Sequence, residues 1–142
     1  MILVIILALV DLYILYITKE PKQLRIVKEK YKTLRDHIKR ENIEVFKNLE
    51  KCIVINGYYS TGGDVGYNTN KGEEIGLCIT GDSNEIFHVL LHELAHSTVS
   101  EYDHSEQFWK NYTKLRDLAI DLGIYSKIPE KVAFCGKHIQ DK

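Results

Sequence analysis

Two histidines and a glutamate stand at a spacing that suits metal-assisted hydrolysis. Residues 92–96 read His-Glu-Leu-Ala-His, and His104 follows eight residues after His96. In a helix, His92 and His96 project from one face about one turn apart, so both imidazoles can reach one zinc ion. Glu93 then lies beside the open position of the metal, where its carboxylate can take a proton from a water molecule. The pattern therefore predicts a Zn2+ site with Glu93 as general base.

The residues before this motif predict the helix that has to carry it. Residues 84–91 contain no helix breaker, and Asp82 precedes Glu85 by three residues, which is the spacing of a capping box. His88 lies one turn before His92, and we interpret it as a supporting or structural residue, because ligands at three successive turns of one helix cannot surround an ion. The side chains that can face the core are Ile86, Val89, Leu90 and Ala95.

The third ligand has to come from outside this helix, because a three-ligand site needs a tetrahedral spread. His104 is favoured, since it stands at the start of a second predicted helix that the burial of Phe108 and Trp109 would anchor. The linker also offers Glu101 and Asp103 as carboxylate alternatives. The second helix has apolar positions at helical spacing and Gly123 as its C-cap. These positions are Phe108, Tyr112, Leu115, Ala119 and Leu122.

Taken together, these motifs resemble the WLM and SprT-like zinc metallopeptidases. The resemblance rests on residues 92–96, His104 and the pair Phe108-Trp109, and it covers roughly residues 22–138. Residues 67–78 are similar to the WLM segment before the active-site helix, and residues 134–136 to compact WLM-type proteins of large DNA viruses. It implies a peptidase with His92, His96 and His104 as zinc ligands, in a family associated with cutting proteins crosslinked to DNA.

The sequence departs from the familiar patterns at two places. Seven residues separate His96 from His104, where five is the more familiar number in this group, which keeps Glu101 and Asp103 open as alternative third ligands. Val99 stands where metzincins carry a glycine, which argues against a metzincin.

Periodicity predicts one α+β domain over residues 19–142, in which a small, mostly antiparallel sheet packs with helices, and the resemblance implies a zincin-like arrangement of these elements. A helix is expected over residues 21–40 and a strand over residues 52–56, followed by a glycine-rich loop over residues 57–66. Strands over residues 66–69 and 74–80 flank an Asn70-Lys71-Gly72 turn, which predicts a hairpin. In a zincin-like sheet, the last strand lies along the cleft, where an extended peptide can add as a further strand.

The glycine-rich loop lacks the pattern of a nucleotide-binding site. A phosphate-binding loop needs a following helix and a Lys-Ser/Thr pair, and here a hairpin follows. Tyr58, Tyr59 and Tyr67 could line the cleft or assist an oxyanion, although loop packing is the simpler interpretation.

Residues 1–18 form a separate apolar segment. Residues 1–17 carry one charged side chain, Asp11, and at about 1.5 Å per residue they cover most of a hydrocarbon core of about 30 Å. Neither a basic region before this stretch nor a cleavage site of small residues is visible, which argues against a signal peptide. The segment predicts a single-pass membrane anchor; a helix packed on the domain or on another chain is the alternative.

Charge and cysteine usage predict where the domain lies. Basic residues crowd directly after the apolar segment, so by the positive-inside rule the domain should face the cytoplasm. Cys52, Cys78 and Cys135 are an odd count without paired spacing, which suits a reducing compartment, and Cys78 falls in a run expected to be core.

Charge is unevenly placed along the chain. Residues 19–47 carry ten Lys or Arg against five Asp or Glu, whereas residues 48–142 carry nine against fourteen. The acidic catalytic part argues against nucleic-acid binding, and the basic first helix could follow phosphates, lie on anionic lipid or simply be solvated.

Two functions remain open at this point. The first is a zinc endopeptidase that acts on a protein or peptide substrate, near a membrane or, less favoured, on DNA-protein crosslinks. The second is a membrane-tethered, non-catalytic module that keeps zinc for structure. Glu93 favours the first, because a structural site has no use for a base beside the metal.

Overall fold

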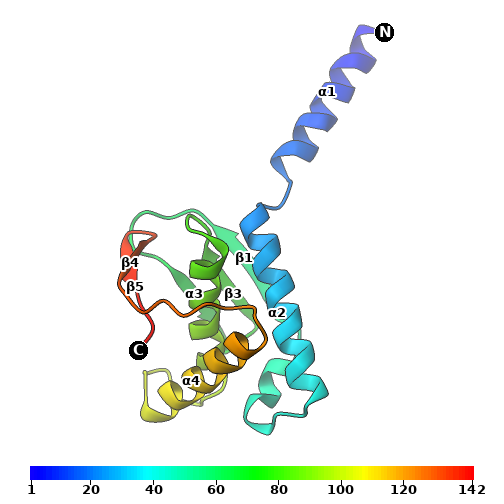
Figure 1. The fold of residues 1–142 in the computed structure, drawn as a ribbon. Coiled ribbons are helices and arrows are strands. Elements are labelled where there is room, and N and C mark those ends of the chain that lie inside the picture. The colour runs from blue at the N-terminus through cyan, green and yellow to red at the C-terminus, as the bar shows by residue number, and fades with distance from the viewer.

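The computed structural model describes residues 1–142 as one α+β body from which the first helix projects (Figure 1). In chain order the elements are α1 (Ile2–Ile17), α2 (Lys22–Arg40), the 3-10 helix η1 (Glu44–Glu50), β1 (Val54–Tyr58), β2 (Gly66–Thr69), β3 (Glu74–Cys78), α3 (Ser83–His96), α4 (Glu106–Asp121), β4 (Val132–Phe134) and β5 (Lys137–Ile139).

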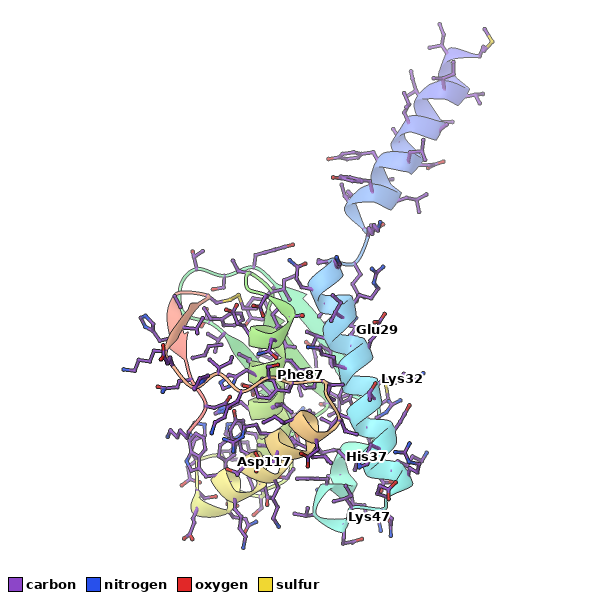
Figure 2. All side chains as sticks on the ribbon, in the orientation of Figure 1. Glu29, Lys32, His37, Lys47, Phe87 and Asp117 are labelled. Atoms are coloured by element: carbon purple, nitrogen blue, oxygen red, sulfur yellow. A yellow bond between two sulfur atoms is a disulfide. The ribbon has the colours of Figure 1, made fainter.

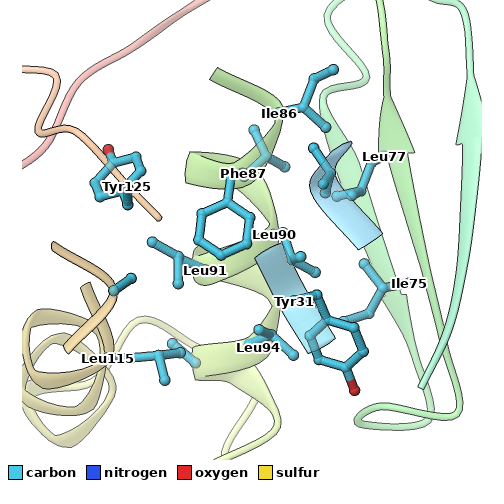
Figure 3. Packing of buried hydrophobic residues seen from close by; sticks show 14 of the residues in the cluster. Tyr31, Ile75, Leu77, Ile86, Phe87, Leu90, Leu91, Leu94, Leu115 and Tyr125 are labelled. Carbon is cyan, nitrogen blue, oxygen red and sulfur yellow. The ribbon is translucent and has the colours of Figure 1, made fainter. Parts of the chain in front are cut away.

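Helix α3 lies at the centre of the fold. It contacts β2 and β3, and it also packs against α2 and α4. Phe87 and Leu90 are fully buried on its core faces (Figure 3), and the Phe87 ring lies 6.3 Å from that of Tyr125. A helix that is packed on several sides has little freedom to rotate, so the side chains on its remaining face are held in fixed directions.

The main sheet is mixed. Its strand order is β1-β3-β2, with β3 parallel to β1 and antiparallel to β2, and β4 pairs with β5 as a separate antiparallel hairpin. The predicted α+β class is confirmed. The parallel β1–β3 pair was not expected; it arises because the β2–β3 hairpin folds back so that β3 lies between the other two strands.

The predicted hairpin is present, whereas the preceding strand is displaced along the chain. Gly66 pairs with Leu77 and Thr69 with Glu74, and the turn contains Asn70 with φ 47° and Gly72 with φ 102°, backbone angles that asparagine and glycine adopt at little cost. Strand β1 begins at Val54 because the Ile53 N–H donates to the Tyr31 hydroxyl (3.2 Å) instead of to the sheet. The glycine-rich loop is correspondingly shorter than predicted.

Helix α2 agrees with its prediction, and its apolar stripe is buried against the core. The buried positions are Leu24, Val27, Tyr31, Leu34 and Ile38.

Helix α1 has no buried side chain, and its apolar residues project on all sides (Figure 2). It is therefore not packed on the domain. No single helix is long and apolar enough to cross a membrane, so the predicted span over residues 1–17 is not supported as one helix. Helices α1 and α2 together, bent by 53°, satisfy that test by length and composition alone.

The cysteine prediction was wrong. Cys78 is fully buried at the end of β3, as expected of a core residue, but it forms a disulfide with Cys135, 57 residues further along the chain. The turn between β4 and β5 brings Cys135 against β3, a proximity that no local spacing could reveal. Cys52 is free and exposed. Disulfides are typical of oxidising compartments, so the cysteines no longer argue for a reducing one.

Candidate metal centre

The start of α3 is fixed by a complete capping box. Asp82 accepts hydrogen bonds from the backbone N–H groups of Asn84 (2.8 Å) and Glu85 (3.0 Å), and the Glu85 carboxylate accepts from the Asp82 N–H (3.0 Å). With its start and its buried faces both fixed, α3 turns His92 and His96 toward the beginning of α4.

The segment between α3 and α4 is held from two sides. From the hairpin turn, Lys71 Nζ donates to the carbonyls of Val99 (2.8 Å) and Glu101 (2.5 Å). At the other end, the Ser105 side chain caps α4 by accepting from the Phe108 N–H (3.1 Å) and donates to the Glu101 carboxylate. These bonds fix both ends of the segment and so place His104, which directly precedes the cap.

Phe108 supports all three imidazoles from beneath. Its ring is fully buried, and its centroid lies 5.1 Å from that of His92, 4.4 Å from that of His96 and 4.8 Å from that of His104. The burial of Phe108, which anchors α4, thus also sets the depth at which the histidines meet.

The three imidazoles converge on one point. Nε2 of His104 lies 2.9 Å from Nε2 of His92 and 3.1 Å from Nε2 of His96, and all three ligand atoms lie within 4.8 Å of one another. Nitrogens bound at about 2.1 Å to a tetrahedral zinc lie about 3.4 Å apart, a few tenths of an ångström longer than these separations. One Nε2 cannot satisfy two neighbouring Nε2 atoms, because it carries either one proton or one lone pair. A single cation among the three resolves that conflict, so the donor set fits zinc.

Burial keeps His92 and His96 in the form that binds metal. It lowers the pKa of His92 to about 3, with a further contribution from His96 and His104. The pKa of His96 is also lowered, by burial first and then by His104 and Lys71. Both imidazoles are therefore neutral at physiological pH, which leaves their lone pairs available.

Glu93 lies next to this cluster and is buried. Its burial raises the pKa of the carboxyl to about 7. Glu93 and His96 line a cavity of about 190 Å³, whose other walls are Asn68, Lys71 and Tyr102. A carboxyl with that pKa can both accept and release a proton near neutral pH.

Comparison with known proteins assigns the family. The model of the WLM domain matches residues 58–140, which contain every residue of this cluster. An uncharacterized protein of Acanthamoeba polyphaga mimivirus is 33% identical over 138 residues, covering 83% of this chain and 70% of the viral protein. The chain belongs to the WLM family. This family is metallopeptidase-like. No solved structure matches the chain.

The WLM domain brings His92, His96 and His104 together and leaves the carboxylate alternatives outside the cluster. Glu101 is used to bind Ser105, and Asp103 is exposed. Two of the three tyrosines have a structural contact, since the rings of Tyr58 and Tyr67 stack with centroids 5.9 Å apart, whereas Tyr59 is exposed.

A buried polar network behind α3 was missed from the sequence. The Asp141 carboxylate accepts from the hydroxyls of Tyr112 (2.7 Å) and Tyr125 (2.6 Å), and His88 Nδ1 lies 2.9 Å from the Tyr125 hydroxyl. His88 is thus a structural residue, as expected. The Tyr112 ring also lies edge-on to His92, with 6.2 Å between centroids, so the network supports the histidine cluster from behind.

Asn68 and Lys71 were also missed. Asn68 donates from Nδ2 to the Glu93 carbonyl (2.7 Å) and to the Ser97 hydroxyl (2.9 Å), which fastens β2 to the end of α3. The sequence placed both residues in the predicted hairpin, but no local pattern indicated that this hairpin packs against α3.

Proposed function

We propose that this WLM domain is a zinc-dependent endopeptidase that hydrolyses peptide bonds of protein substrates. In this proposal His92, His96 and His104 hold the ion and Glu93 is the general base. The observation that carries it is the convergence of three Nε2 atoms beside a buried carboxyl that opens into a cavity.

Zinc bound there would polarise the scissile carbonyl and lower the pKa of a water molecule to about 7. Glu93 takes the proton of the attacking water. The protonated Glu93 carboxyl then delivers that proton to the leaving amine. A module that keeps zinc only for structure would not need a buried base facing a cavity, which is why we place that alternative second.

The fold offers a path for an extended substrate in a zincin-like arrangement. Strand β2 forms one edge of the main sheet, and Asn68 ties it to the carbonyl of Glu93 (2.7 Å). A peptide that adds to this free edge as a further strand would pass beside the base.

We propose an ordinary protein substrate rather than a DNA-protein crosslink. Residues 48–142 carry nine basic against fourteen acidic side chains, and this balance disfavours the phosphate contacts that dominate nucleic-acid binding. If single-stranded DNA stimulated cleavage and high salt removed this stimulation, the hypothesis of a DNA-protein crosslink as substrate would be favoured instead.

We also propose that residues 1–18 attach the domain of residues 19–142 to a membrane. Support comes from α1, whose apolar side chains are all exposed, and from the basic residues that follow it. Those basic residues favour a domain on the cytoplasmic side, whereas the Cys78–Cys135 disulfide is typical of an oxidising compartment. We keep the cytoplasmic side as the proposal, because the buried sulfurs of this disulfide are shielded from dissolved thiols.

The test uses the full chain in detergent micelles, loaded with zinc, with an unfolded protein as substrate. The wild type should cleave it, and a chelator should stop cleavage until zinc is restored. Glu93→Gln should keep one zinc per chain and lose hydrolysis, because glutamine leaves the imidazoles in place but cannot accept the proton. If Glu93→Gln cleaved at a rate near that of the wild type, the assigned mechanism would be wrong.

A further inference from the structure

The hairpin turn between β2 and β3 places a lysine in the cavity of the general base. Lys71 lines this cavity of about 190 Å³ with Glu93 and His96, and Tyr102 and Asn68 complete it. The backbone of Lys71 is held in the left-handed region, with φ 54°, between Asn70 and Gly72. Its position therefore follows from the turn, and it does not depend on a flexible loop.

The Lys71 ammonium is fixed but not neutralised. Nζ donates to the carbonyls of Val99 (2.8 Å) and Glu101 (2.5 Å), and it lies 4.3 Å from the centroid of the Tyr102 ring. An ammonium group has three N–H donors, so one remains after these two bonds. No carboxylate forms an ion pair with Lys71 within 4.0 Å.

Among the other walls of the cavity, Glu93 is the one acidic residue, and it forms no ion pair with Lys71 within 4.0 Å. The Asn68 side chain is fully used, since its Nδ2 donates to the Glu93 carbonyl and to Ser97 while its Oδ1 accepts from the Gly72 N–H (2.7 Å). Tyr102 is the one apolar wall residue. An apolar guest would bury little apolar surface and would take water from an unpaired ammonium, and a basic guest would be repelled.

We propose that this cavity is a substrate subsite for an acidic side chain, aspartate or glutamate, at a residue adjoining the scissile bond. Lys71 is its specificity-determining residue, and its free N–H donates to the substrate carboxylate in a charge-assisted hydrogen bond. Residues Glu93 and His96 in the same cavity place the subsite next to the reacting carbonyl; this step rests on the proposed peptidase function.

The experiment compares peptides that differ only at the two residues flanking the cleaved bond. With the zinc-loaded full chain in micelles, kcat/KM should be at least tenfold higher for Asp or Glu than for Asn or Gln at one of these positions, and lowest for Lys. Lys71→Gln should reduce the acid-to-amide ratio to within threefold, and Lys71→Glu should reverse the order in favour of Lys. Lys71→Arg should preserve the acidic preference. Lys114→Gln, which removes an exposed charge on α4, is the matched control and should leave the ratio unchanged.

The ratio of kcat/KM for acidic over amide peptides is compared because Lys71 also holds the segment before His104, so its replacement can lower the overall activity. Zinc content is measured for each variant. If a Lys71 variant loses zinc, the comparison of wild type with Lys71→Arg and the binding of the same peptides to zinc-loaded Glu93→Gln decide the question. Cleavage without an acidic preference, or a preference that zinc-loaded Lys71→Gln retains, would overturn the subsite. If the wild type cleaves no peptide, the peptidase function fails instead; the subsite then stands only if acidic peptides bind at least tenfold tighter than their amide counterparts.

Discussion

Removal of the Asp141 carboxylate should destabilise the domain by several kcal/mol. The carboxylate accepts from the hydroxyls of Tyr112 (2.7 Å) and Tyr125 (2.6 Å) and from the Ile128 N–H (2.7 Å). In Asp141→Ala, a neutral His88 can still accept from one hydroxyl, since its Nδ1 lies 2.9 Å from that of Tyr125. Two buried donors are then left without an acceptor, at about 1–3 kcal/mol each, so we expect a loss of about 2–6 kcal/mol. Against a total stability of about 5–15 kcal/mol, this is a large fraction.

Urea unfolding of the chain that begins at Lys19, followed by Trp109 fluorescence, measures this loss. Removing α1 should not disturb the comparison, because none of its side chains is buried. The control is Asp121→Ala, an exposed residue at the end of α4 that should change stability by less than about 0.5 kcal/mol. A loss below about 1 kcal/mol in Asp141→Ala would refute the reasoning that the network is tightly paired.

The same carboxylate should make the stability depend on pH. Burial by itself would raise the pKa of Asp141, but hydrogen bonds from His88, Tyr125 and Tyr112 outweigh it and hold the pKa well below its usual range. The contribution of Asp141 is therefore complete above the unfolded pKa of about 3.9 and is lost as the pH falls below it. The free energy of unfolding, measured with a chelator present, should fall between about pH 5 and pH 3 more steeply in the wild type than in Asp141→Asn. If the free energy of unfolding fell equally steeply with pH in the wild type and in Asp141→Asn, the lowered pKa of Asp141 would be contradicted.

Three further outcomes test the remaining structure. His104→Ala should weaken zinc affinity by on the order of a hundredfold or more, while Glu101→Ala and Asp103→Ala should have milder effects in the same metal titration; the reverse pattern would transfer the ligand role to a carboxylate. Replacing both Cys78 and Cys135 by serine should lower the free energy of unfolding by about 4 kcal/mol, the value for a closed loop of 57 residues, and an unchanged stability would mean that the thiols are unpaired in solution. The full chain should resist alkaline carbonate extraction, the chain from Lys19 should not, and protease added on the cytoplasmic side should digest the domain; protection there would reverse the proposed topology.

Features that depend on a few neighbouring residues could be predicted from the sequence. The capping box of Asp82 and Glu85 and the turn at Asn70 and Gly72 are local, since each is decided by hydrogen bonds or backbone angles within about four residues. The spacing of His92, Glu93 and His96 is local for the same reason. His104 could be named as a candidate by its residue type, but its choice over Asp103 depended on the packing of Phe108 beneath all three imidazoles.

Features that depend on contacts between distant segments could not be predicted. Cys78 and Cys135 meet only because the β4–β5 hairpin folds over β3, and Lys71 enters the cavity only because the β2–β3 turn packs on the end of α3. The sequence around Asp141 gives no sign that its carboxylate is buried, but the residue is only 6% exposed. In each case the deciding partner lies more than ten residues away, beyond the reach of periodicity or spacing.

The disulfide between Cys78 and Cys135 determines what happens to a molecule that is cut by another copy of the proposed peptidase. The bond closes residues 78–135 into a covalent ring, and α3, α4 and the four residues of the proposed centre all lie inside that ring. Residues 102–104 and 129–131 are exposed stretches outside helices and strands within this ring, where a protease can cut the chain. A single cut there would open the ring without separating its halves, so a nicked molecule would keep His96 and His104 on one covalent unit. Such a molecule would migrate intact on a non-reducing gel and as two fragments after reduction.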